Sequence, residues 1–155
     1  ISYFKTGRLF EAAARSGAIL ANGDASYIKN STNFSKNLGI LFQIKDDLLD
    51  YKIESSSGKP NFQDIKEKKI TYPFYFAYKN ANKAQEKLLK GFLKKDFIDN
   101  NKLYSLISDL GGIKSTHELA MNYFHSAEKS AHRIKIKTVR DEMLNLLSNS
   151  INRDK

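Results

Sequence analysis

The chain has 155 residues, of which 41% are hydrophobic, so it is long enough to form one compact domain with a buried core. It contains no cysteine, which excludes disulfides, thiolate zinc sites and cysteine nucleophiles. Its net charge of +9 favours an anionic partner: a nucleic acid, an anionic membrane surface or a phosphorylated small molecule.

Hydrophobic spacing predicts an all-α fold, because no alternating strand pattern of useful length is present. The first helix is rich in alanine and leucine and is expected to end near Asn22 and Gly23. The second is one long helix or a broken pair. The expected ranges are 2–21, 25–52, a helix that begins after residue 71, 82–94, 99–110, 115–136 and 137–151.

The ends and flanks of the chain suggest how it is organised. The helical pattern begins at Ile1 without a preceding cap, so a fragment or one half of a split protein is expected. The first residues lack the layout of a secretory signal, and a cytoplasmic location is expected. No apolar run reaches the roughly 18 residues of a membrane span, so none is expected.

Local signals predict a loop and two helix caps. Residues 52–69 contain three serines, a glycine and a proline, a composition typical of a flexible loop. Thr71 is the expected N-cap of the next helix, with Pro73 in its first turn. Ser115 and Glu118 match the capping-box spacing, which predicts that a helix opens there.

Three aspartates interrupt the apolar segment "FQIKDDLLDY", residues 42–51. Each helical residue advances by about 100°, so Gln43, Asp46, Asp47 and Asp50 share one narrow polar stripe. Carboxylates this close repel one another unless a cation lies between them. Magnesium prefers oxygen ligands, usually one or two carboxylates with water and phosphate. A solvated acidic face fits the same spacing.

Three lysines give the acidic stripe a possible chemistry. Lys5 precedes Thr6 in the first helix, Lys59 lies in the expected loop, and Lys69 closes that loop. Ammonium groups that converge on acid-bound magnesium would form a diphosphate site. Each lysine taken alone is typical of a solvated surface position, and only its coincidence with the acidic stripe favours a site.

Three segments together resemble the trans-isoprenyl diphosphate synthases, or polyprenyl synthetases, and most closely the long-chain, octaprenyl-type bacterial enzymes. They are "KTGRLFEAAA" (5–14), "GILFQIKDDLLDY" (39–51) and "GKPNFQDIKEKKITYP" (58–73). The resemblance implies an isoprenoid-synthase-type helical bundle (C-terminal part). It also implies that residues 1–155 form a single partial domain, lacking the N-terminal half with the first aspartate-rich motif.

The resemblance further implies a prenyltransferase. Its reaction would be the Mg²⁺-dependent condensation of isopentenyl diphosphate with an allylic diphosphate to a long-chain polyprenyl diphosphate. The implied residues are Lys5, Lys59 and Lys69 for the allylic diphosphate; Asp46 for magnesium, with Asp47 and Asp50 as ligands or supporting residues; and Lys5, Thr6 and Gln43 at the reacting centre.

The sequence departs from the family pattern at several places. The first aspartate-rich motif and the isopentenyl-binding Gly-Lys-Arg segment are absent. The usual Gly-Asp-Asp of the third segment is Phe62, Gln63 and Asp64, and the loss of that glycine is expected to alter the closure of the loop. Activity is therefore expected only together with an N-terminal half, in a homodimer or in association with a separate half chain.

Two other functions fit parts of the sequence. The chain could be a non-catalytic remnant or a regulatory partner of such an enzyme. A basic nucleic-acid binder is the third reading, but the basic run at 66–69 lacks interleaved aromatic residues, so no nucleic-acid partner is expected.

Overall fold

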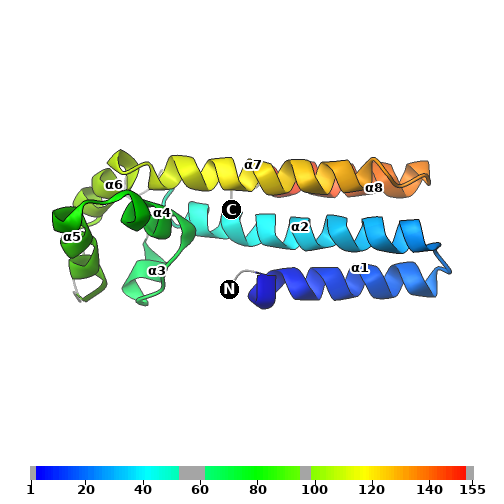
Figure 1. The fold of residues 1–155 in the computed structure, drawn as a ribbon, viewed down its shortest axis with the longest axis horizontal. Helices are drawn as coiled ribbons and strands as arrows, with labels where there is room; N and C mark the ends of the chain where they lie inside the picture. Colours follow the sequence, from blue (N-terminus) through cyan, green and yellow to red (C-terminus); the bar gives the residue numbers. More distant parts are fainter. Residues whose placement is uncertain (1–2, 53–61, 95–98, 153–155) are drawn as a thin grey trace. The chain divides into compact units, whose positions relative to one another are not determined.

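The computed structural model describes residues 3–52, 62–94 and 99–152. Within these ranges the chain forms a π-helical turn and eight α-helices, without a strand, which confirms the predicted all-α class (Figure 1). None of the described helices is long and apolar enough to cross a membrane. The elements are η1 (Tyr3–Gly7), α1 (Arg8–Leu20), α2 (Ala25–Leu49), α3 (Gln63–Lys66), α4 (Tyr72–Asn80), α5 (Lys83–Lys94), α6 (Asn100–Asp109), α7 (Gly112–Ala131) and α8 (Lys137–Ile151).

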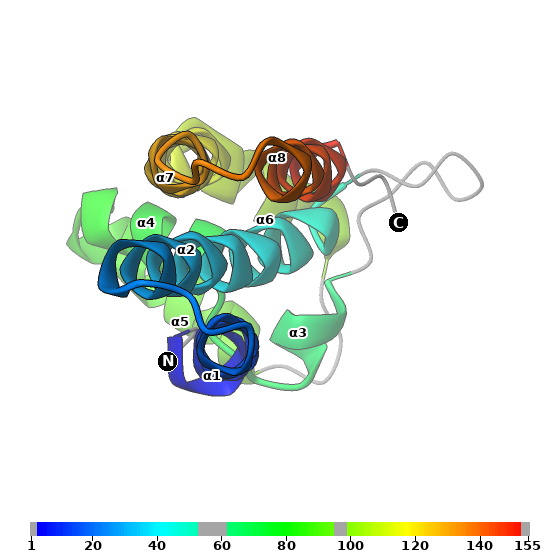
Figure 2. The ribbon, with the colours of Figure 1, turned by 90° about the vertical axis from the view of Figure 1, so that its right-hand side faces the viewer.

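The chain divides into two compact units. Unit 1 comprises Ile1–Lys45 and Ala120–Lys155, and unit 2 comprises Asp46–Leu119. Helices α2 and α7 each contribute residues to both units. In unit 1, α2 lies between α1 on one side and the adjacent pair of α7 and α8 on the other (Figures 1 and 2).

The turn between α1 and α2 follows from two polar residues. Asn22 adopts the left-handed conformation (φ 51°), which asparagine reaches more easily than most residues. The Asp24 carboxylate accepts a hydrogen bond of 2.7 Å from the Tyr27 backbone N–H. A carboxylate in this position is a good N-cap, because it satisfies a donor that the helix itself leaves unpaired. The predicted helix end near Asn22 is therefore confirmed.

Unit 2 has its own hydrophobic core, contributed by the residue two positions after α2, by α3 and its N-cap, and by the helices α4 to α6. Its buried members are Tyr51, Phe62, Ile65, Phe74, Ala77, Leu89, Leu103 and Ile107. The Tyr51 ring meets the Phe62 ring edge-on, with centroids 5.0 Å apart. The hydroxyls of Tyr51 and Thr71 lie 2.8 Å apart, so each buried hydroxyl has a partner.

The structure corrects two expectations about the segment 52–69 and its end. The described part of this segment contains the short helix α3, where a loop was expected. Thr71 does occupy the N-cap position of α4, but its side chain makes no capping hydrogen bond. Its hydroxyl pairs instead with Tyr51, and a carboxylate from another element takes over the capping, as described below.

The expected capping box at Ser115 and Glu118 is also wrong. Helix α7 begins at Gly112, three residues earlier, and the Ser115 N–H donates to the Gly111 carbonyl at 2.9 Å. Ser115 is therefore already inside the helical hydrogen-bond ladder. By contrast, the long second helix is a single helix, and the last helix spans 137–151 as predicted.

Candidate functional site

The acidic stripe lies at the C-terminal end of α2. Gln43 and Asp47 are buried, whereas Asp46 and Asp50 are half-buried. Asp50 directly follows Leu49, the last residue of the helix. Because α2 is continuous up to that point, its residues follow the helical spacing on which the stripe was predicted.

Thr6 and Gln43 are brought together from distant parts of the sequence. The Thr6 hydroxyl donates to Gln43 Oε1 at 3.0 Å, across a separation of 37 residues. Thr6 and the exposed Lys5 both belong to the π-helical turn η1. Such turns are rare in proteins and are found frequently at functional sites.

A contact between two glycines makes the Thr6–Gln43 hydrogen bond possible. A Cβ atom at Gly39 would lie 2.9 Å from the Gly7 Cα and 3.0 Å from the Phe10 Cβ. The backbones of η1 and α2 therefore approach too closely for a side chain at this point. One helical turn further on, this close approach places Thr6 within reach of Gln43.

Aromatic and charged groups extend the same crossing. The Lys36 ammonium lies 5.0 Å from the centroid of the Tyr3 ring. The Tyr3 hydroxyl donates to Glu11 at 2.6 Å, and this hydrogen bond raises the pKa of Tyr3. Residues 36, 39 and 43 are spaced by three and four positions, so η1 packs along one face of α2.

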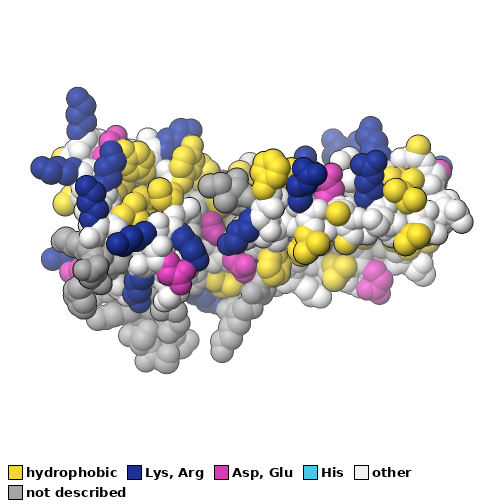
Figure 3. Space-filling model, turned by 90° about the horizontal axis from the view of Figure 1, so that it is seen from below, with side chains coloured by type: hydrophobic (Ala, Val, Ile, Leu, Met, Phe, Trp, Pro, Cys, Tyr) yellow, Lys and Arg dark blue, Asp and Glu magenta, His cyan; other side chains and the backbone are white. Residues whose placement is uncertain are grey.

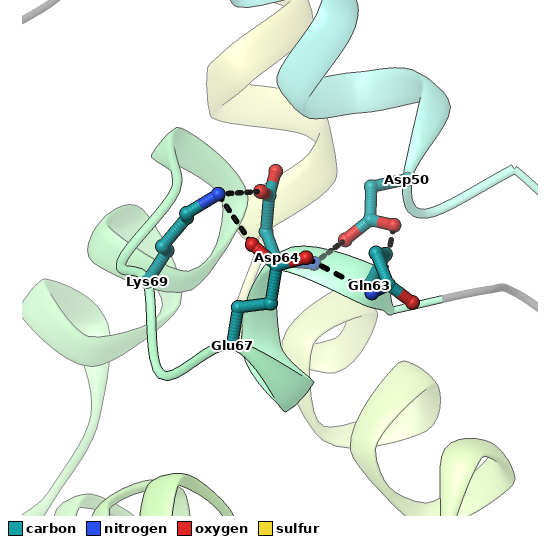
Figure 4. Close-up of polar contacts among 5 residues, drawn as sticks. All are labelled: Asp50, Gln63, Asp64, Glu67 and Lys69. Carbon is teal, nitrogen blue, oxygen red and sulfur yellow. Dashed lines mark hydrogen bonds and ion pairs between the residues drawn. The ribbon is translucent and has the colours of Figure 1, made fainter.

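Asp50 holds the start of α3 through its side chain (Figure 4). Its Oδ1 accepts from the Gln63 backbone N–H at 2.7 Å, and its Oδ2 accepts from the Asp64 N–H at 3.1 Å. Burial raises the pKa of this carboxyl, while the two N–H donors act in the opposite direction. Both oxygens of Asp50 are thus engaged with backbone donors.

Asp47 performs a similar function for α4. Its Oδ2 accepts from the Tyr72 backbone N–H at 3.1 Å, at the first residue of that helix. This N–H is one of the donors that a helix start leaves unpaired. Asp47 and Asp50 therefore fix two points of the chain, at 63–64 and at 72.

Lys69 is turned toward carboxylates of its own segment (Figure 4). Its ammonium lies 2.5 Å from Glu67 and 3.7 Å from Asp64. The hydrogen bond to Glu67 raises the pKa of Lys69, and the same contact lowers the pKa of Glu67. Since the Lys69 side chain is 56% exposed, the ammonium can exchange these partners for a phosphate with little loss.

Phe62 takes the place of the glycine expected by resemblance, and its backbone keeps a glycine-like conformation. Its φ of 51° and ψ of 37° lie in the left-handed region, which costs a residue with a Cβ about 1–2 kcal/mol. Its side chain is fully buried against Tyr51. Burial of the ring therefore offsets the strain of the backbone.

The structure brings together some of the predicted site residues. Thr6 contacts Gln43, while Asp47 and Asp50 are joined to the segment that carries Lys69. Lys59 lies outside the described residues. Within residues 3–52, 62–94 and 99–152, no three His, Asp or Glu side chains gather closely enough to hold a metal ion between them.

Sequence reasoning missed two contributors to this geometry, Gly39 and Tyr51, and for Phe62 it did not predict the left-handed backbone or the buried ring. A glycine in the middle of an amphipathic helix is a detectable signal, because it weakens the helix unless something approaches closely. The hydrogen bond between Tyr51 and Thr71 leaves no signal in the spacing of the sequence.

Comparison with known proteins places this chain in a family. The polyprenyl synthetase family matches residues 1–110. A decaprenyl-diphosphate synthase of Dictyostelium discoideum is 33% identical over 146 residues, which are 94% of this chain and 32% of that protein. A probable mitochondrial hexaprenyl pyrophosphate synthase of Yarrowia lipolytica is 30% identical over 155 residues, 99% of this chain and 34% of that protein. The chain thus spans about a third of the length of these curated relatives.

The fold agrees with solved structures. A decaprenyl diphosphate synthase from Rhodobacter capsulatus superposes with a TM-score of 0.88 at 28% identity, over 99% of this chain and 49% of that one. A polyprenyl synthase from Caulobacter crescentus, solved in complex with calcium and isoprenyl diphosphate, gives a TM-score of 0.85 at 26% identity, over 99% and 48%. The chain therefore belongs to the polyprenyl synthetase family.

Proposed function

We propose that this chain supplies the magnesium and allylic-diphosphate part of a prenyl-elongating enzyme. The reaction is the condensation of isopentenyl diphosphate with an allylic diphosphate to a long-chain polyprenyl diphosphate. The decaprenyl and hexaprenyl synthases among the relatives support this substrate class and product type. The expected cytoplasmic location stays a prediction.

The observation that carries the proposal is the hydrogen bond between Thr6 and Gln43. It joins the Lys-Thr pair to the helix of the aspartate-rich motif, and these are two of the segments on which the family resemblance rests. The crossing requires a glycine in the middle of α2, and glycine at such a position lowers helix stability. A site under functional demand accounts for such an arrangement better than a solvated acidic face does.

The carboxylates of α2 fit magnesium as a donor set. Magnesium binds one or two protein carboxylates and fills its remaining positions with water and substrate phosphate, so a group of three is not required. Asp46 would hold the ion, with the Asp47 carboxylate as a second ligand. Asp50, whose two oxygens accept backbone hydrogen bonds, would position the 63–64 segment without touching the ion. When bound, magnesium would neutralise charge on the departing diphosphate.

The lysines would bind the diphosphate directly. Lys5 and Lys69 are exposed, and the lysine ammonium group is a cationic hydrogen-bond donor. Such cations stabilise a diphosphate most where negative charge develops as the allylic carbon–oxygen bond breaks. Without a substrate, the Lys69 ammonium is paired with Asp64 and Glu67. It would leave these carboxylates for the more highly charged diphosphate. Thr6 and Gln43 would orient the reacting end of the substrate.

We also propose that the active enzyme includes a complementary half of the bundle, in a longer chain or an associated one. Four large apolar side chains of η1 and α1 are exposed, and hydrophobic groups gather over α1 on the face shown in Figure 3. They are Phe4, Leu9, Ile19 and Leu20. In the active enzyme these side chains would be covered by the complementary half. A homodimer stays a prediction.

A chimaera tests the proposal. The half of the Rhodobacter capsulatus synthase that this chain does not match would be fused to residues 1–155. The fusion and the 155-residue chain alone would be incubated with magnesium, farnesyl diphosphate and labelled isopentenyl diphosphate. We expect labelled polyprenyl product from the fusion and none from the chain alone.

Two variants of the fusion provide the control. Asp46→Ala is expected to lower turnover by roughly a hundredfold or more, the effect of losing one group that stabilises transition-state charge. Asp99→Ala removes the half-buried N-cap carboxylate of α6, which has no part in the proposed site, and should leave turnover unchanged. A folded fusion without activity would overturn the proposal in favour of a non-catalytic remnant or regulatory partner.

A further inference from the structure

Helix α5 carries a stripe of lysines that the proposed reaction does not use. Lys83, Lys87, Lys90 and Lys94 are all exposed. Taking Lys83 as zero, the other three lie at about 40°, 340° and 20° around the helix, so that the four side chains span about 60°. They form one cationic edge along the whole length of α5.

The charge of this stripe is only partly compensated. Glu86 is the one acidic residue of α5, and its carboxylate already has two partners. It accepts a hydrogen bond of 3.0 Å from the Tyr78 hydroxyl and lies 3.7 Å from Lys90. Within the described parts of the chain, no carboxylate pairs with Lys83, Lys87 or Lys94. Three positive charges therefore remain open to a ligand.

An apolar hollow lies directly beside the lysines. It is an open depression on the surface of α5, lined by Ala84, Lys87, Leu88, Gly91 and Phe92. A second depression, lined mainly by the lysines, adjoins it and shares Lys87 and Gly91. Leu88 is 58% exposed although it is a large aliphatic residue. Figure 3 shows Lys and Arg side chains bordering hydrophobic ones at the end of the picture where α5 lies.

The core of unit 2 fixes which way this surface faces. Leu89 is fully buried, and Phe92 and Leu93 pack against the same core cluster. The hydrogen bond from Tyr78 to Glu86 ties α5 to α4 on a second side. The lysine stripe and Leu88 are consequently presented outward by a helix that cannot rotate to bury them.

We propose that α5 is a docking surface for an anionic lipid bilayer. A bilayer offers negative headgroups to the lysines and, directly below them, an apolar layer to Leu88 and Ala84. Amphipathic helices with lysines beside aliphatic residues bind membrane interfaces in this way. Nucleic acid complements the charge but gives no reason for the exposed leucine beside it.

Vesicle sedimentation tests the role of the lysines. The 155-residue chain would be mixed with vesicles of phosphatidylcholine, with and without phosphatidylglycerol, and pelleted. We expect binding only to the anionic vesicles, weakened by salt. The triple variant Lys83→Glu, Lys87→Glu, Lys94→Glu should lose roughly a hundredfold in affinity, since each basic residue near an anionic surface contributes about fivefold.

A matched triple variant separates this site from the overall charge of the chain. Lys129→Glu, Lys135→Glu and Lys137→Glu change the net charge by the same amount at exposed positions of unit 1. This variant should keep most of the binding. Equal losses in the two triple variants would mean that only net charge matters and would overturn the proposal, as would the absence of binding to anionic vesicles.

Tryptophan fluorescence tests the apolar contact, because the chain contains no tryptophan of its own. In the Leu88→Trp variant we expect a blue shift of emission when anionic vesicles are added. The Leu146→Trp variant, at a position of similar exposure (55%), should show no shift. The proposal would be overturned if neither variant showed a blue shift and the chain bound an RNA oligonucleotide as tightly as it binds anionic vesicles. The ligand would then be nucleic acid. None of these readouts depends on prenyl transfer.

Discussion

Two regions hold the candidate site residues, and they are built on different physical principles. At the crossing of η1 and α2, the two backbones can approach closely because Gly7 and Gly39 have no side chains. This close approach brings the Thr6 hydroxyl to Gln43. At the end of α2, the starts of α3 and α4 are positioned by hydrogen-bond acceptors, because the carboxylates of Asp50 and Asp47 accept from their backbone N–H groups. The first region should be sensitive to added atoms, and the second to lost acceptors and lost packing.

The largest effect is expected at Phe62. Phe62→Ala should lower the free energy of unfolding by about 3–5 kcal/mol, because a fully buried ring is lost. Phe62→Gly should be less harmful than Phe62→Ala by about 1 kcal/mol, since glycine relieves the strain at φ 51°. Urea denaturation followed by circular dichroism measures both.

Phe74 is the matched control for Phe62. It is equally buried but lies in the regular helix α4, where glycine is worse than alanine by about 1 kcal/mol. The order of the glycine and alanine variants should therefore reverse between the two positions. The same order at both would contradict the left-handed conformation of Phe62.

At the glycine crossing, one methyl group should be costly. Gly39→Ala places a Cβ against the Gly7 backbone and should lower the free energy of unfolding by about 1–3 kcal/mol. Gly17→Ala, in α1 where no atom lies within 4 Å of the added Cβ, should instead raise it by up to about 1 kcal/mol. Equal effects of the two substitutions in urea denaturation would rule out a close crossing.

At the second region, removal of the acceptor should matter more than removal of the charge. Asp50→Ala leaves the Gln63 and Asp64 N–H groups without their acceptors and should cost about 1–2 kcal/mol. Asp50→Asn retains one acceptor and should cost less. Asp109→Ala, at an exposed position at the end of α6, is a control that should have no measurable effect in the same assay.

The Thr6 hydroxyl should make a small contribution. Thr6→Val keeps the shape of the side chain but removes the donor to Gln43, for a loss of about 0.5–1.5 kcal/mol. Thr6→Ser retains the hydroxyl and should preserve the hydrogen bond. Amide-resolved NMR of the Gln43 side chain can follow it, and an unchanged Gln43 signal in Thr6→Val would contradict the contact.

The smallest effect is the pH dependence of stability. It should have opposite signs at two carboxylates that accept hydrogen bonds from the first turn of a helix, Asp50 at α3 and Asp99 at α6. Burial raises the pKa of Asp50 above its ordinary value, so its contribution to stability is greatest in acid and falls as pH rises through the raised pKa. The Lys102 N–H lowers the pKa of Asp99, so its contribution is present at neutral pH and is lost as pH falls. Urea denaturation of Asp50→Asn and Asp99→Asn from acid to neutral pH should give differences from the unsubstituted chain that change in opposite directions.

The sequence allowed the long elements to be predicted and hid the contacts that position the site. Helices α2 and α8 have a regular apolar spacing over many residues, and both were predicted. Helix α3 has only four residues, which is too short for a periodic apolar pattern. The carboxylate that accepts from its first N–H belongs to Asp50, 13 positions earlier in the sequence, so no local signal predicts the helix. Phenylalanine has no preference for the left-handed region, and only the glycine expected from the resemblance marks Phe62 as unusual.

The two aspartates at the end of α2 have a consequence for hydrogen exchange. The amides of Gln63 and Asp64 belong to α3 and that of Tyr72 to α4, yet all three donate to the carboxylates of Asp47 and Asp50, which are three positions apart in sequence. Amides that depend on one supporting element open together, as a single cooperative unit. These three should therefore share one free energy of opening, and fraying of the last turn of α2 should release all of them at once.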